Sequence, residues 1–119
     1  VIVMGGLVAR KTDTCTTGHT CDATTTLNFA QSTVFAEEQL VARIDDPTVL
    51  HDIPTRTRTG TDEEGNAIYT FPCKPHVGTV RTGNSTVYAE NKLVTFLGET
   101  VSCSNGKITS SASTVYVEN

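Results

Sequence analysis

The chain has 119 residues, of which 37% are hydrophobic and 6% aromatic, with no tryptophan. This length predicts a single domain over residues 1–119. The low apolar content predicts a thin core that needs further stabilisation by disulfides, a metal ion or a partner. A net charge of −4 argues against a nucleic-acid partner, because neutralising phosphates takes clustered basic residues, whereas Arg56 and Arg58 share their stretch with three acidic residues at 62–64.

The opening segment, VIVMGGL, contains a four-residue apolar run with no basic region before it. A signal peptide combines a basic start with a longer apolar stretch, and a membrane-spanning helix needs about 20 apolar residues. We therefore expect neither a cleaved signal peptide nor a transmembrane segment.

Residues 7–13, LVARKTD, are the second half of a unit that recurs along the chain. The unit is complete at 32–46, STVFAEEQLVARIDD, and at 85–99, STVYAENKLVTFLGE, and its first half stands again at 113–119, STVYVEN. Each copy is rich in β-branched and aromatic residues and alternates with period two. We therefore expect each copy to form two short strands around a tight turn, near Glu90-Asn91 in the copy at 85–99.

The split copy, with its halves at the two ends, predicts that the chain closes on itself. Its last strand should pair beside its first, so that no sheet edge stays open. With three copies in all, the expected fold is all-β. It is a compact cone of short strands with pseudo-three-fold internal repeats, in which the termini close the third repeat.

The connector between the two complete copies is the longest of the three. It contains the stretch 54–72, PTRTRTGTDEEGNAIYTFP, which is rich in threonine, glycine and charged residues. This composition is typical of turns and exposed segments, so we interpret 54–72 as an insertion that forms a loop or a small hairpin.

All three histidines and all four cysteines lie in the connectors between copies of the unit. In a three-fold body these connectors converge at one end of the axis, and convergent imidazoles with a thiolate are what a tetrahedral zinc site requires. Register relative to the repeated units selects four metal ligands: His19, His51, His76 and Cys103. Four protein ligands leave no position for an activated water, so the pattern predicts a structural zinc.

The other three cysteines leave alternatives open. Cys15 and Cys21 flank His19 and are alternative ligands in its place. They are also close enough in sequence to pair across a loop, and Cys73 could meet either of them. If Cys103 is a metal thiolate, at most one disulfide forms among these three cysteines.

The whole pattern resembles that of PAAR-repeat proteins, which cap the spikes of contractile injection machines such as type VI secretion systems and contractile phage tails. The resemblance rests on NSTVYAENKLV at 84–94 and on the two VAR segments at 8–10 and 41–43, and it covers nearly the whole chain except 54–72. Members of that family carry a zinc bound by three histidines and one cysteine near the vertex, which implies this role for the four ligands selected above.

The chain departs from the family at the hairpin turn, where Glu37-Glu38 and Glu90-Asn91 stand in place of Asn-Gly. The resemblance implies a structural, membrane-piercing tip seated on a trimeric β-helical spike, with transient contact to a target membrane and no small-molecule substrate. The resemblance also implies a localisation, either at the spike tip of a phage tail or outside the cell after secretion through a contractile apparatus. The implied cofactor is a structural Zn²⁺, with iron left open.

Two other classes of function remain as alternatives. One is a secreted β binding module stapled by disulfides, which predicts no metal and blocked thiols. The other is a small zinc hydrolase in which water replaces one ligand. The usual sequence signatures of hydrolases and nucleotide-binding enzymes are absent, so we expect the chain not to be an enzyme.

Overall fold

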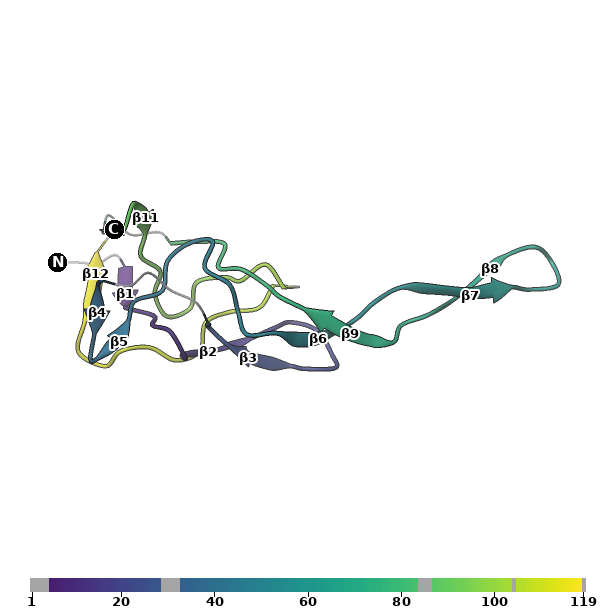
Figure 1. Ribbon diagram of the computed structural model, residues 1–119, viewed down its shortest axis with the longest axis horizontal. Helices are drawn as coiled ribbons and strands as arrows, with labels where there is room; N and C mark the ends of the chain where they lie inside the picture. The colour runs from purple at the N-terminus through teal and green to yellow at the C-terminus, as the bar shows by residue number, and fades with distance from the viewer. Residues whose placement is uncertain (1–4, 29–32, 84–86, 104, 119) are drawn as a thin grey trace.

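The computed structural model describes residues 5–28, 33–83, 87–103 and 105–118, which form an all-β protein of short antiparallel strand pairs (Figure 1). The predicted all-β class is therefore confirmed. The pairs are β1 (Gly5–Leu7) with β12 (Tyr116–Glu118), β2 (Thr14–Thr16) with β3 (Thr24–Thr26), β4 (Phe35–Ala36) with β5 (Gln39–Leu40), β6 (His51–Pro54) with β9 (Cys73–His76), β7 (Thr57–Thr61) with β8 (Ala67–Thr70), and β10 (Tyr88–Ala89) with β11 (Lys92–Leu93).

The β4–β5 and β10–β11 hairpins each turn on two residues with positive φ. These are Glu37 (51°) and Glu38 (69°) in the first, and Glu90 (48°) and Asn91 (69°) in the second. Two successive positive φ angles define the type I′ turn, whose twist matches that of the flanking strands. The tight turn predicted near Glu90-Asn91 is present, although neither hairpin has the glycine that such turns favour.

The two ends of the chain are joined by β1 and β12, which pair from Gly5 opposite Glu118 to Leu7 opposite Tyr116. This is the pairing that the split copy of the unit predicts. Within the described residues, no helix is long and apolar enough to cross a bilayer.

Three segments bond to one another in a closed ring at the centre of the body. The Ala42 amide donates to the Ala9 carbonyl (2.9 Å), Ala9 donates to Thr95 (3.1 Å), and Thr95 donates to Ala42 (3.1 Å). The side chains of all three residues are buried. Because each segment donates to one neighbour and accepts from the other, the ring has no free edge at this level.

A turn follows each segment of the ring, and the three turns share one geometry. Each contains a single residue with positive φ, Thr12 (75°), Asp45 (69°) or Gly98 (90°). In the second turn, the buried Arg43 guanidinium donates to both carboxylate oxygens of Asp46, at 3.2 and 3.0 Å. Bidentate pairing satisfies two groups that would be costly to bury alone.

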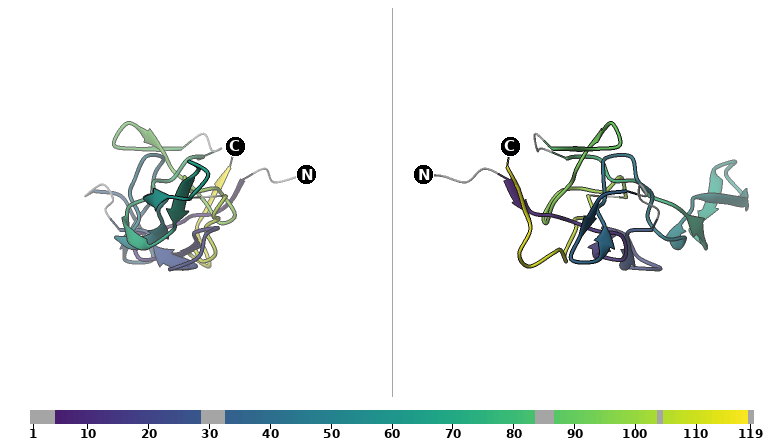
Figure 2. Two further views of the ribbon diagram at one scale, coloured as in Figure 1. Left: turned by 90° about the vertical axis from the view of Figure 1, so that its right-hand side faces the viewer. Right: turned by 60° about the vertical axis from the view of Figure 1, so that its left-hand side comes forward.

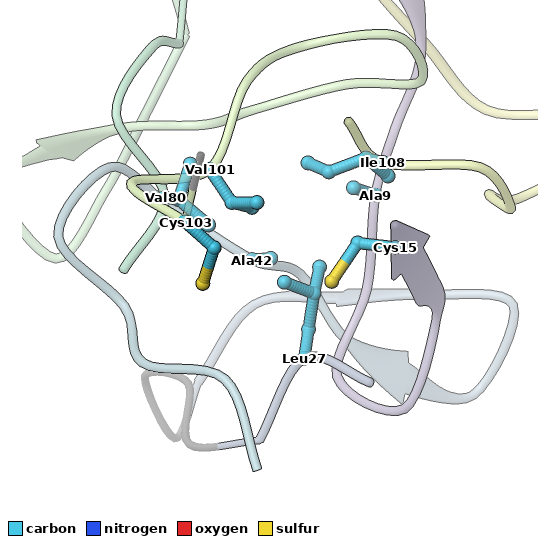
Figure 3. Close-up of a cluster of buried hydrophobic side chains, with 8 residues drawn as sticks. All are labelled: Ala9, Cys15, Leu27, Ala42, Val80, Val101, Cys103 and Ile108. Carbon is cyan, nitrogen blue, oxygen red and sulfur yellow. The ribbon is translucent and has the colours of Figure 1, made fainter. Parts of the chain in front are cut away.

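The core consists of two small clusters stacked along the body. One lies among the hairpins and includes Val8, Val41, Val94 and Phe96. The second includes two residues of the ring and is formed by Ala9, Cys15, Leu27, Ala42, Val80, Val101, Cys103 and Ile108 (Figure 3). Most of these side chains are small, so the core is thin, as the composition predicts.

Strands β6 to β9, residues 51–76, form one long ribbon that projects from the body (Figures 1 and 2). The Thr55 amide donates to the Pro72 carbonyl (2.9 Å) and joins the two strand pairs of the ribbon. Stretch 54–72 is thus a hairpin and not an irregular loop. Because of the ribbon, the principal extents are 64 × 30 × 23 Å, and the molecule is more extended than the compact body that we expected.

Candidate metal centre

The root of the ribbon brings together the four side chains that the sequence selects as metal ligands. His19, His51, His76 and Cys103 each offer one ligand atom, and these atoms all lie within 4.8 Å of one another. His51 and Cys103 are buried, and His19 and His76 are partly buried. Residues from four separate parts of the chain thus form one cluster.

The ribbon itself places two of the ligands. His51 begins β6 and His76 ends β9, and the two residues are directly opposite in the antiparallel register. Opposite residues in such a pair point to the same face of the sheet. His19 comes from the loop between β2 and β3, and Cys103 follows Val101, which forms a bridge with Val80.

The three imidazole rings pack against one another. His19 and His51 are stacked with their centroids 5.2 Å apart, and His76 meets both rings edge-on, at 5.8 and 4.9 Å. Burial lowers the pKa of His76, and the charges of His51 and His19 lower it further. This favours the neutral imidazole, which is the form that binds a metal ion.

Hydrogen bonds fix which nitrogen of two of the rings carries the proton. His19 Nδ1 lies 2.8 Å from the Thr20 carbonyl, and His51 Nδ1 lies 2.9 Å from the Val49 carbonyl. A carbonyl only accepts, so each Nδ1 is the donor and each Nε2 keeps its lone pair. Backbone carbonyls hold metal-binding histidines in proteins in the same way.

The Nε2 atom of His19 is the observation that best tests the fit of a metal ion. Among the buried side-chain nitrogen and oxygen atoms of the described residues, it alone has no hydrogen-bond partner. Leaving such an atom unsatisfied costs about 1–3 kcal/mol. A cation within the cluster would accept this lone pair, so the structure around His19 fits a metal ion.

The sulfur of Cys103 completes the cluster. Its Sγ lies 3.3 Å from Nε2 of His76 and 3.5 Å from Nε2 of His51. Burial raises the pKa of the Cys103 thiol, so the thiolate needs a nearby cation to form at neutral pH. Three imidazole nitrogens and one sulfur are a donor set that Zn²⁺ takes in tetrahedral structural sites.

Gly78 makes room for this sulfur. Gly78 was not among the site residues predicted from the sequence. A Cβ atom on Gly78 would lie 2.3 Å from Cys103 Sγ, which is inside the van der Waals contact distance. Its amide also donates to the Thr48 hydroxyl (3.0 Å), which lies 3.4 Å from His51 Nδ1. The one feature of the sequence that could have pointed to Gly78 is its position two residues after the predicted ligand His76.

The other cysteines do not join the cluster. Cys21 and Cys73 form a disulfide, and Cys15 is a free, fully buried thiol in the second core cluster. The Cys15–Cys21 pairing considered above is therefore not formed. Cys15 lies on β2 among apolar side chains, and burial raises its pKa to about 11, so it packs as a small apolar residue.

Comparison with known protein families finds no family model that matches the chain, and comparison with curated proteins finds no match. The class of protein is therefore defined by fold and site. The chain is an all-β protein of short antiparallel strand pairs with a His₃Cys group suited to hold a metal ion.

Proposed function

We propose that the chain is the tip of a piercing spike in a contractile injection machine, similar to PAAR-repeat proteins, and that its role is mechanical and not enzymatic. One observation carries the proposal. The strand pairs β1–β12, β4–β5 and β10–β11 lead into the closed ring of Ala9, Ala42 and Thr95, and the His₃Cys cluster lies at the root of the ribbon that projects from the other end of the body (Figure 1). This arrangement would give a base of three strand pairs and a metal cross-link at the opposite end of the body, where the ribbon begins.

Pseudo-three-fold symmetry is the first element of the proposal. The three strand pairs β1–β12, β4–β5 and β10–β11 each lead into one segment of the ring, and equivalent turns follow the three segments. Phe35, Tyr88 and Tyr116 occupy the same place in the repeated unit, and their side chains are 60%, 64% and 63% exposed. Exposed aromatics are typical of protein interfaces. They suit a partner with three-fold symmetry, so we propose that the base seats on a trimeric β-helical spike.

A structural metal ion, zinc in our proposal, is the second element. The cluster lies at the root of the ribbon and shares Cys103 with the small second core cluster. A structural zinc contributes on the order of 10 kcal/mol to folding and would cross-link four segments there. If the four protein side chains filled a tetrahedral shell, the metal would stiffen the root of the ribbon and would have no open position at which to activate water.

Stoichiometry with a trimeric β-helical spike tests the proposal. A three-fold base within one chain should bind one copy per trimer, measured by light scattering on the purified mixture. Replacing Tyr88 and Tyr116 by serine should abolish the complex, whereas replacing Tyr69 on the ribbon should not. Binding of three copies per trimer, or binding that survives the Tyr88 and Tyr116 substitutions, would contradict the proposal.

The Cys21–Cys73 disulfide favours a second candidate function, a secreted β binding module held by disulfides and without metal. Elemental analysis of the purified protein separates the two. One tightly held zinc per chain supports the spike tip, and protein that neither contains nor takes up a metal supports the binding module.

A further inference from the structure

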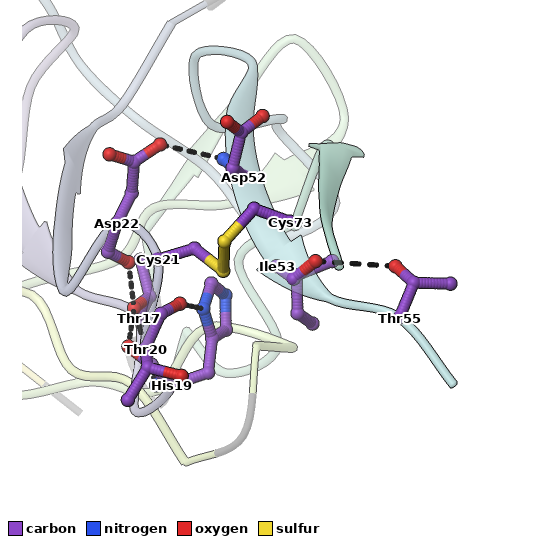
Figure 4. Close-up of a disulfide and its surroundings, with 9 residues drawn as sticks. All are labelled: Thr17, His19, Thr20, Cys21, Asp22, Asp52, Ile53, Thr55 and Cys73. Carbon is purple, nitrogen blue, oxygen red and sulfur yellow. Dashed lines mark hydrogen bonds between the residues drawn. A yellow bond between two sulfur atoms is a disulfide. The ribbon is translucent and has the colours of Figure 1, made fainter. Parts of the chain in front are cut away.

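The disulfide lies directly beside the metal ligands. Cys21 follows His19 by two residues, and Cys73 precedes His76 by three. The Cα atoms of the two cysteines are 5.8 Å apart, and Figure 4 draws the bond together with His19, which lies on the same loop as Cys21. The bond therefore ties the loop that carries one ligand to the ribbon that carries two others.

Besides the disulfide, the His19 ring packs against His51 and His76 of the ribbon, and a pair of hydrogen bonds joins the loop to the ribbon. The Asp52 amide donates to the Asp22 carboxylate (2.7 Å), and the Asp22 amide donates to the Asp52 carbonyl (3.3 Å). Other bonds of the loop are internal, such as that from the Thr17 hydroxyl to the Asp22 carbonyl (2.6 Å). Most of residues 18–23 are exposed, so the loop has little apolar surface to anchor it. The disulfide is thus the covalent link between the loop that carries His19 and the ribbon.

The four cysteines differ in their access to solvent. Cys21 and Cys73 are exposed, whereas Cys15 and Cys103 are 0% and 1% exposed. Thiol–disulfide exchange needs a thiolate to reach a sulfur atom, so an exposed disulfide is reducible in the folded protein. A small thiol such as glutathione can attack this bond while the ligand Cys103 stays protected.

We propose that the Cys21–Cys73 bond is a redox-controlled lock on the metal centre, an inference that rests on the metal binding proposed above. When the bond is closed, it holds His19 against His51 and His76. One thiol molecule attacks the bond and forms a mixed disulfide with one cysteine, and a second thiol then releases that cysteine. The two thiol molecules leave as a disulfide, and Cys21 and Cys73 gain two protons and two electrons. His19 is then free to move, and the metal ion loses one preorganised ligand.

The lock predicts that zinc affinity depends on the redox state of this one bond. Removing a group that orients a metal ligand typically lowers affinity 10- to 100-fold. We expect a loss of about tenfold or more when the protein is reduced with a phosphine, which does not itself bind zinc strongly. Competition with a chromophoric chelator at neutral pH measures the affinity, and reoxidation should restore it.

Two variants separate the lock from other effects of reduction. The double variant C21S/C73S should bind zinc as weakly as the reduced protein and should not respond to phosphine. Because this variant lacks the thiols of Cys21 and Cys73, it also excludes zinc binding by those thiols as the cause of a change. The variant C15A removes a buried thiol outside the site, and it should keep the full response of the wild-type protein.

Three results would overturn the inference. Equal zinc affinity in the oxidised and reduced proteins overturns the lock and leaves the metal site standing. Zinc binding in neither form overturns the metal site as well. Four titratable thiols in denatured protein that was purified in air would show that the bond does not form.

Discussion

At the scale of single residues, Gly78 and Cys103 depend on one another. Gly78 is buried, and its missing Cβ leaves the space that the Cys103 sulfur fills. The requirement is one of space and not of backbone conformation, because Gly78 is not among the glycines with positive φ. The metal centre therefore depends on a residue that is not itself a ligand.

The substitution Gly78→Ala should displace the sulfur and disable the site. We expect zinc affinity to fall at least 100-fold, because a methyl group cannot fit 2.3 Å from Cys103 Sγ. Overpacking should also cost about 1–3 kcal/mol of folding free energy. Chelator competition and thermal melting measure the two effects.

Gly60→Ala is the matched control, because a Cβ on Gly60 in the ribbon meets nothing within 4 Å. It should leave zinc affinity unchanged. Full zinc binding by the Gly78→Ala protein would contradict the geometry of the site.

At the scale of elements, Glu37 connects the β4–β5 turn to the segment that leads into β12. Its carboxylate accepts from the amides of Ser113 (2.9 Å) and Thr114 (2.8 Å), from both of their hydroxyls, and from Arg10 (3.3 Å). The bonds from Thr114 and Ser113, with that from the Thr114 hydroxyl the largest cause, lower the pKa of Glu37. An acidic residue in this turn thus accepts hydrogen bonds from the segment that leads into the neighbouring β1–β12 pair.

Glu37→Gln should lower the melting temperature by about 2–5 °C at neutral pH, since charged acceptors form stronger hydrogen bonds than neutral ones. Because the pKa of Glu37 is lowered in the folded state, its contribution is present above the ordinary value of 4.5 and is lost as the pH falls below it. The difference between the two proteins should therefore shrink in acid.

Glu38→Gln, in the same turn, is the matched control and should melt like the wild-type protein. Melting curves at neutral and acidic pH check both statements. Equal melting temperatures for the Glu37 and Glu38 variants would show that the bonds to Ser113 and Thr114 do not stabilise the fold.

At the scale of the whole molecule, we expect the thin core to make stability depend on the proposed metal ion. A chelator should lower the melting temperature by about 10 °C or more, because it removes the cross-link among four segments. Differential scanning calorimetry with and without chelator measures this effect, and Cys103→Ala should respond little to the chelator. Unchanged melting of the wild-type protein would contradict a structural metal.

Acid should weaken the same centre. The pKa of His76 is lowered in the folded protein, so the unfolded chain binds more protons as the pH falls through 6.5, the ordinary value. Stability from this group is therefore complete above 6.5 and is lost below it. Protonation of the histidines would also compete with the metal ion, so chelator sensitivity should vanish in acid.

Local patterns predicted much of the fold and of the site. The period-two pattern and the β-branched residues indicated short strands, and the split copy of the unit indicated that β1 and β12 pair. The positions of His19, His51, His76 and Cys103 relative to that unit predicted the cluster, because equivalent connectors lead to the same end of the body. These features follow from order along the chain.

Only the tertiary structure decided the rest, because it depends on distances between residues that are remote in sequence. Spacing left the partner of Cys21 open, and the folded chain places Cys73 beside it while Cys15 faces the core. Sequence likewise did not show that stretch 54–72 continues β6 and β9 as a projecting ribbon, nor that Gly78 meets a sulfur. Periodicity determines which strands form, whereas close contacts are determined by how the strands pack.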